Sequence, residues 1–283
     1  MGRTSLWLKS VTALVMCLPA AACGPRSTDE NEHREAPAPV TFEGADVINA
    51  AAKLDHGKRL TFVLGCRGCH GELLEGEQFA SDHPEYGPIY ASNLTRVVPK
   101  FTDGQLEAIL RDGTHPERKV VWSMPSEMFH SLSKADMGAI VAYLRSLPEG
   151  GEPTPAPKFS ALDRKDIASG EYKAAPGVIA DAIKKPPVDL GTDYALGRYI
   201  TMSACTECHG SDLRGRPNDT PNLGIATAYS RDEFERLMTT GVPLGGRKLR
   251  MMDGVARGRT AHMTRRERDA LYVYLKARAE QQQ

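Results

Sequence analysis

Apolar side chains recur at helical spacing in two stretches of this 283-residue chain, 101–113 and 229–241. Residues three and four positions apart share one face of a helix, so each stretch predicts an amphipathic helix. The apolar positions are Leu106, Ile109 and Leu110 in the first stretch and Phe234, Leu237 and Met238 in the second.

Polar residues mark where these two helices begin and end. A Ser or Thr followed three positions later by Glu or Gln forms a capping box, and a glycine after the last turn permits a left-handed C-cap. The residues concerned are Thr102, Gln105 and Gly113 in the first stretch and Ser230, Glu233 and Gly241 in the second. Two further helices are predicted to follow Ser133 and Thr264. Convincing strand alternation is absent, so the expected fold class is all-α.

The four helices belong to an internal repeat. Residues 101–113 match 229–241 at an offset of 128, and "VAYLRS" (141–146) matches "YVYLKA" (272–277) at an offset of 131. We therefore expect two tandem helical domains, 49–149 and 191–280. The intervening residues 150–190 contain six prolines, which favour a stiff connector with a short helix around Pro176–Lys184.

An export signal precedes the domains. Arg3 and Lys9 give a positive start, and an apolar run too short to span a bilayer then leads to three small residues, Ala20-Ala21-Ala22. Residues 1–22 are therefore predicted to be a signal peptide. Residues 23–48 are predicted to be a flexible tether, because their first part has too little apolar content to fold.

Cys23 directly follows the predicted signal peptide. The stretch "LPAAAC" resembles a bacterial lipoprotein signal, which implies that Cys23 becomes an acylated N-terminus. Several acyl chains on one residue suffice for stable anchoring. The expected location is periplasmic, as a membrane-anchored lipoprotein; ordinary secretion, with a free thiol at Cys23, is the alternative.

Four of the six cysteines lie in two C-x-x-C-H boxes, Cys66–His70 and Cys205–His209. This pattern is the signature of c-type haem attachment. Two thiols three positions apart reach the two vinyl groups on one porphyrin edge, and the adjacent histidine is carried beneath the iron. The boxes predict two covalently attached haem c groups. The expected attachment residues are Cys66, Cys69, Cys205 and Cys208, with His70 and His209 as iron ligands.

Two other interpretations of the boxes compete with haem attachment. A zinc site needs a fourth ligand and usually a second cysteine pair, and neither box offers one. A redox dithiol of the thioredoxin type expects a βαβ context, which the sequence lacks. Repetition of the box in an exported helical chain favours haem over both.

Candidates for the sixth iron ligand follow the capping glycines in each repeat. The first repeat offers Met124, Met128 and His130, and the second offers Met251 and Met252. Met124 and Met252 both lie eleven residues beyond their glycine, at 113 and 241, so they are the expected distal ligands. Core packing is the alternative role for each methionine.

With these boxes and methionines, the chain resembles a bacterial di-haem cytochrome c built from two class I modules. The resemblance covers residues 55–149 and 191–280, through "GKRLTFVLGCRGCHG", "WSMP", "GRYITMSACTECHG" and "MMDGVARGR". It extends to cytochrome subunits that take electrons from membrane-bound alcohol, aldehyde or gluconate dehydrogenases, although those usually carry three haems. It implies that Gly57 and Gly197 let the first helix of each module pack closely against the last, near Tyr143 and Tyr274.

Some residues keep two interpretations. Asn93 and Asn222 could support the haem pocket or act as turn residues. Trp122 could donate its N–H to a haem propionate or pack in the core. A run of cations near Met252 could steer an acidic partner or be scattered, solvated charges; these are Arg247, Lys248, Arg250, Arg257 and Arg259.

Charge and ligation together define the expected function. The chain has 36 Lys and Arg against 36 Asp and Glu, so nothing points to nucleic acid. Iron with histidine and methionine ligands has no open position for a substrate, which favours an electron carrier rather than an enzyme. The expected partners are a donor and an acceptor redox protein, including a membrane-bound dehydrogenase or a terminal oxidase. A di-haem peroxidase, a haem-based gas sensor and a haem-bearing dehydrogenase subunit are the alternatives.

Overall fold

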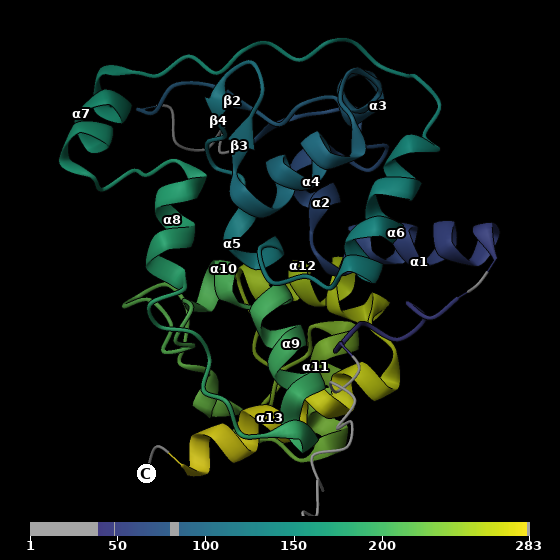
Figure 1. Cartoon of the computed structure of the whole chain (residues 1–283). Coiled ribbons are helices and arrows are strands. Elements are labelled where there is room, and N and C mark those ends of the chain that lie inside the picture. The colour runs from purple at the N-terminus through teal and green to yellow at the C-terminus, as the bar shows by residue number, and fades with distance from the viewer. Residues whose placement is uncertain (1–38, 48, 80–84, 282–283) are drawn as a thin grey trace, which may run out of the picture. The chain divides into compact units, whose positions relative to one another are not determined.

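A computed structural model describes residues 39–47, 49–79 and 85–281 of the chain (Figure 1). Helices dominate this part of the chain, as the all-α expectation requires, and none of the described helices is long and apolar enough to cross a membrane. The predicted signal peptide, most of the predicted tether and Cys23 lie outside the described residues, so they stay predictions.

The described elements fall into three consecutive parts, named here by their residues. The N-terminal module (49–149) holds α1 (Ala50–Val63), α2 (Cys66–His70), α3 (Leu94–Val97), α4 (Asp103–Asp112), α5 (Ser126–Phe129) and α6 (Lys134–Arg145). The connector (150–190) holds α7 (Ala161–Ser169) and α8 (Ala175–Ala182). The C-terminal module (191–280) holds α9 (Ala195–Ala204), α10 (Thr206–His209), α11 (Arg231–Thr240), α12 (Met251–Gly258) and α13 (Arg265–Glu280).

Short elements complete the described fold. Two antiparallel pairs of two-residue strands lie in the N-terminal module, and the sequence pattern did not predict them. They are β1 (Gln78–Phe79) with β2 (Ile89–Tyr90), and β3 (Thr114–His115) with β4 (Lys119–Val120). The 3₁₀ turns are η1 (Val98–Lys100), η2 (Thr192–Tyr194), η3 (Leu223–Ala228) and η4 (Thr260–His262).

The predicted helix ends form as expected. Thr102, Ser230 and Thr264 each begin a helix with both hydrogen bonds of a capping box, and Ser133 caps α6 by accepting a backbone N–H. The glycines after α4 and α11 adopt left-handed conformations, with φ of 64° and 78°. The backbone polar groups at these helix ends are therefore satisfied by nearby residues.

The first and last helices of each module cross at a glycine. A Cβ atom added to Gly57 of α1 would lie 2.1 Å from a backbone oxygen of α6 and 2.8 Å from Tyr143 Cβ. A Cβ added to Gly197 of α9 would lie 2.2 Å from a backbone oxygen of α13 and 2.5 Å from Tyr274 Cβ. No side chain fits at either crossing. The same close contact is therefore built twice, α1 on α6 and α9 on α13 (Figure 1).

The two modules contact each other through buried carboxylates in equivalent places. Asp136 and Glu267 are the third residues of α6 and α13, and both are fully buried. Asp136 accepts a hydrogen bond from the Tyr199 hydroxyl of α9 at 2.7 Å, and Glu267 accepts one from the Arg59 guanidinium of α1 at 2.8 Å. A buried carboxylate needs such partners, because an unpaired charge would be costly there.

These contacts are reciprocal. Arg59 lies two positions after Gly57, and Tyr199 lies two positions after Gly197. The first helix of each module thus reaches the start of the other module's last helix from the same place. Reciprocal contacts between equivalent surfaces are the pattern of a twofold-related interface. The backbone N–H groups of two adjacent residues, Phe42 and Glu43, complete the two sites, at 3.0 Å from the Asp136 carboxylate and 2.8 Å from that of Glu267.

The connector packs along the N-terminal module. The predicted short helix forms as α8, and Ala175 at its start donates a backbone hydrogen bond to Val121 at 3.0 Å. Helix α7 was not predicted. The Trp122 ring lies 5.3 Å from Phe159 and 5.1 Å from Tyr172, both in the connector, so this tryptophan packs in an aromatic cluster.

Candidate haem attachment sites

The first box forms one helical turn. Helix α2 begins at Cys66, directly after Gly65, which adopts a left-handed conformation with φ of 77°. Residues three positions apart on a helical turn lie on one side of it, so Cys66 and Cys69 can present both thiols to one edge of a ligand. Both cysteines are partly buried and neither is in a disulfide.

The second box forms a similar turn, but fewer residues separate it from the glycine of the preceding helix. Helix α9 ends at Ala204, and α10 follows Cys205 at once. Cys205 follows Gly197 by eight positions, whereas Cys66 follows Gly57 by nine. The additional residue of the N-terminal module is taken up where Gly65 turns between α1 and α2. Cys205 and Cys208 are likewise partly buried and free.

Each box histidine is held by a backbone carbonyl. The Nδ1 atom of His70 lies 2.7 Å from the oxygen of Ser92, and that of His209 lies 2.9 Å from the oxygen of Pro221. A carbonyl can only accept, so Nδ1 carries the proton and Nε2 keeps the lone pair needed to bind a metal. Burial lowers the pKa of both imidazoles, which favours the neutral, ligating form.

The asparagines that follow these carbonyls are helix caps. Asn93 accepts a hydrogen bond from the Thr95 backbone and donates to the oxygen of Gly150 at 2.8 Å. Asn222 accepts one from the Gly224 backbone at 2.8 Å. Their place one residue after Ser92 and Pro221 fixes the carbonyls that orient the histidines. The asparagines therefore act as turn residues, and they position the backbone carbonyls that hold the two histidines.

The surroundings of the four thiols test the two other interpretations of the boxes, a redox dithiol and a zinc site. Burial raises the pKa of the Cys66 thiol to about 11 and that of Cys205 to about 12, and it also raises the pKa of Cys69 and Cys208. Reactive dithiols instead need a lowered pKa, so these sites do not resemble redox centres. Among the described residues, no three His, Cys, Asp or Glu side chains are grouped to hold a metal ion, as a structural zinc site requires.

The candidate distal ligands differ in exposure. Met124, in the loop between β4 and α5, and Met252, the second residue of α12, are both partly buried against the core. Met251 is 64% exposed, and Met128 is fully buried among core side chains. The ligand assignment of Met124 and Met252 stays a prediction.

Of the five cations near Met252, two are paired within the C-terminal module. Arg257 forms an ion pair with Asp253 one turn earlier in α12, and Arg259 pairs with Glu207 at 2.7 Å. The remaining three lie in an exposed loop, named here the basic loop, which consists of Arg247, Lys248 and Arg250. Within the described structure no ion pair forms at the basic loop.

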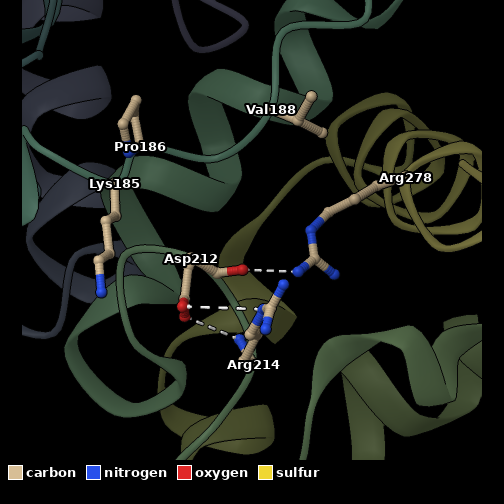
Figure 2. Close-up of a pocket in the computed structure, with 6 residues that line it drawn as sticks. All are labelled: Lys185, Pro186, Val188, Asp212, Arg214 and Arg278. Carbon is tan, nitrogen blue, oxygen red and sulfur yellow. Dashed lines mark hydrogen bonds and ion pairs between the residues drawn. The ribbon is translucent and has the colours of Figure 1, made fainter. Parts of the chain in front are cut away.

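A polar pocket is lined by residues of the connector, of the segment after the second box and of α13. Figure 2 shows the six side chains that line it, among them Asp212, three residues after His209, and Arg278 of α13. The buried Arg278 guanidinium donates to the Asp212 backbone oxygen at 2.5 Å, while the Asp212 carboxylate lies near Arg214. Arg278 thus holds the segment after the box against α13. Sequence patterning gave no sign of this contact.

Comparison with known proteins agrees with the geometry of the first box. Residues 54–148 match the family model for Cytochrome c. The chain is also 24% identical over 243 residues to one of the subunits of nicotinate dehydrogenase from Pseudomonas putida (strain KT2440), an alignment that covers 72% of this chain and 19% of that protein. The chain therefore spans about a fifth of the length of this relative.

Residues 54–148 form a cytochrome c domain. Domains of this class hold haem c covalently and transfer electrons through its iron. The first C-x-x-C-H box and its carbonyl-bound histidine lie inside this range. The residues present fit the group, because they supply two thiols on one turn and an imidazole whose free nitrogen is the metal-binding one.

Proposed function

We propose that the protein is a di-haem c-type cytochrome that passes electrons between redox partners. The observation that carries this proposal is that the histidine of the second box, His209, is held by a backbone carbonyl as His70 is. The repeated glycine crossing supports a second cytochrome domain over residues 191–280. Bound haem would supply the one-electron redox couple, and the protein supplies its ligands, burial and docking surface.

The roles of the residues follow from this proposal. Cys66 and Cys69 would hold the first haem and Cys205 and Cys208 the second. His70 and His209 would bind iron through Nε2, and Met124 and Met252 would each supply a second protein ligand. Six-coordinate iron leaves no position for a substrate, so this ligation favours electron transfer over peroxidase or gas-sensing chemistry.

Carbon monoxide separates these functions. Absorption spectra of the reduced full-length protein should be unchanged by carbon monoxide at native pH if both irons are six-coordinate. A Met252→Ala variant is the matched positive control, because it would open one iron. Rapid, stoichiometric binding by the unmodified protein would contradict the electron-carrier proposal and favour an enzyme or sensor.

The proposed location is the periplasm, where acylated Cys23 anchors the protein to a membrane. The supporting observation is the sequence "LPAAAC" at the end of the predicted signal peptide. In the native host, Cys23→Ser should move the protein into the soluble periplasmic fraction, whereas Cys17→Ser should not. Unchanged membrane association of the Cys23 variant would contradict the lipid anchor.

The proposed partners are a donor and an acceptor redox protein, one of them a membrane-bound dehydrogenase or a terminal oxidase. Similarity to a protein named as a dehydrogenase subunit supports a dehydrogenase on the donor side. Affinity purification of the tagged protein from detergent-solubilised host membranes should then recover a dehydrogenase that reduces it. Recovery without reduction would contradict the donor assignment.

A further inference from the structure

Arg259 of the C-terminal module lies against the haem-attachment turn of the N-terminal module. A Cβ atom added to Gly65 would lie 2.2 Å from the Arg259 guanidinium carbon, and one added to Gly68 would lie 3.5 Å from its Nη2 atom. Gly65 immediately precedes Cys66, and Gly68 lies between the two cysteines. The guanidinium therefore packs directly on the backbone of the first box.

The same guanidinium is bound to the second box. Arg259 Nη1 lies 2.7 Å from Glu207 Oε2, and the two side chains are only 18% and 29% exposed. Glu207 stands between Cys205 and Cys208. One half-buried ion pair thus joins the two haem-attachment turns, which come from different modules.

The sequence makes room for this contact only in the N-terminal module. The segment from Gly57 to Cys66 is one residue longer than the segment from Gly197 to Cys205, and the additional residue is Gly65. The backbone of Gly65 is left-handed, which favours glycine. Any side chain at Gly65 would overlap the guanidinium. The turn before the first box is therefore shaped to receive an arginine from the other module.

The modules are also joined elsewhere in the interface, where Arg59 contacts Glu267 and Tyr199 contacts Asp136, both of them fully buried carboxylates. Arg259 places a positive charge at the point where the two boxes meet, and Glu207 places a negative charge beside it. A positive charge favours the reduced state of a nearby haem, because reduction adds one electron to that haem.

We propose that Arg259 and Glu207 form a positioning pair that holds the two haem-attachment turns against each other and sets the reduction potentials of both haems electrostatically. The proposal rests on the proposed di-haem function. It assigns to one residue of the C-terminal module control over the reduction equilibrium of both haems. The pair acts through charge and position and takes no part in ligating iron.

Charge-changing variants of the full-length, haem-loaded protein test this pair. Arg259→Gln should lower the midpoint potentials of both haems, with about a fivefold change in each reduction equilibrium, or roughly 40 mV at 59 mV per tenfold. Glu207→Gln should raise both potentials, and Arg259→Lys should restore most of the Arg259→Gln loss. Arg257→Gln is the matched control, because its ion pair lies within α12 and should move at most one potential.

Opposite shifts of the midpoint potentials in Arg259→Gln and Glu207→Gln cannot arise from loosened packing alone. The Soret circular dichroism couplet of two adjacent haems should also weaken in Arg259→Gln and persist in Arg257→Gln. Equal potentials in wild type and Arg259→Gln, or the same shift in Arg257→Gln, would overturn the proposal. A wild-type protein with only one covalent haem would instead overturn the di-haem function, so the two failures are distinguishable.

Discussion

The glycine crossings give a sharp test of the repeated packing. Gly57→Ala in α1 puts a methyl group 2.1 Å from a backbone oxygen of α6, where a carbon–oxygen contact normally needs about 3.3 Å. The two helices must therefore move apart by roughly 1 Å. Overpacking of this kind costs about 1–3 kcal/mol. The alanine offsets this cost by about 1 kcal/mol through its higher helix propensity.

A matched control separates propensity from the clash. Gly138 lies in the facing helix α6, and a Cβ atom added there would meet only Lys53 Nζ, at 3.8 Å. Gly138→Ala should therefore gain up to about 1 kcal/mol in the free energy of unfolding. Gly57→Ala should lie about 1–3 kcal/mol below this control, and Gly197→Ala should behave like Gly57→Ala.

The assay is urea unfolding of the haem-loaded protein, followed by far-ultraviolet circular dichroism. A free-energy difference of 1 kcal/mol corresponds to about 2–4 °C in Tm for a chain of this size, so thermal melts offer an independent check. If Gly57→Ala and Gly197→Ala are as stable as Gly138→Ala, the helices do not cross closely. The helix crossings would then no longer support a repeated module.

Three further predictions concern the ligands, the interface and the surface. Met124→Ala and Met252→Ala should each abolish one thioether-to-iron charge-transfer band and lower one potential; a silent Met252→Ala beside an active Met251→Ala would contradict the second assignment. Asp136→Ala removes the fully buried carboxylate that binds the other module and should cost about 3–5 kcal/mol in urea unfolding, and a change below 1 kcal/mol would contradict the interface. Neutralising the basic loop should flatten the salt dependence of electron exchange with an acidic redox protein, and an unchanged slope would contradict steering by this loop.

Local signals predicted much of the fold. Capping residues such as Thr102 and Ser230 formed the expected boxes, because a cap depends on residues three positions apart. The connector helix α8 starts with a proline near its first position, which is also a local signal. The two-residue strands were missed, because segments this short depend on contacts with the rest of the fold. Helix α7 was missed although Ser160 and Asp163 form a capping box at its start, which is a local signal.

The candidate site was predicted only where side chains carry the chemistry. The cysteines and histidines of both boxes follow from their spacing, whereas the carbonyls of Ser92 and Pro221 are backbone atoms whose role no residue type reveals. Arg259 was grouped with exposed cations near Met252. Its true surroundings depend on a contact between modules that no sequence period describes.

The number of covalent haems tests the central claim most directly. The mature full-length protein, made in a host that attaches c-type haem, would be denatured and its intact mass measured. The account predicts the polypeptide plus two haems, and plus one haem for a variant carrying Cys205→Ser and Cys208→Ser. A wild-type mass with one haem or with none would contradict it.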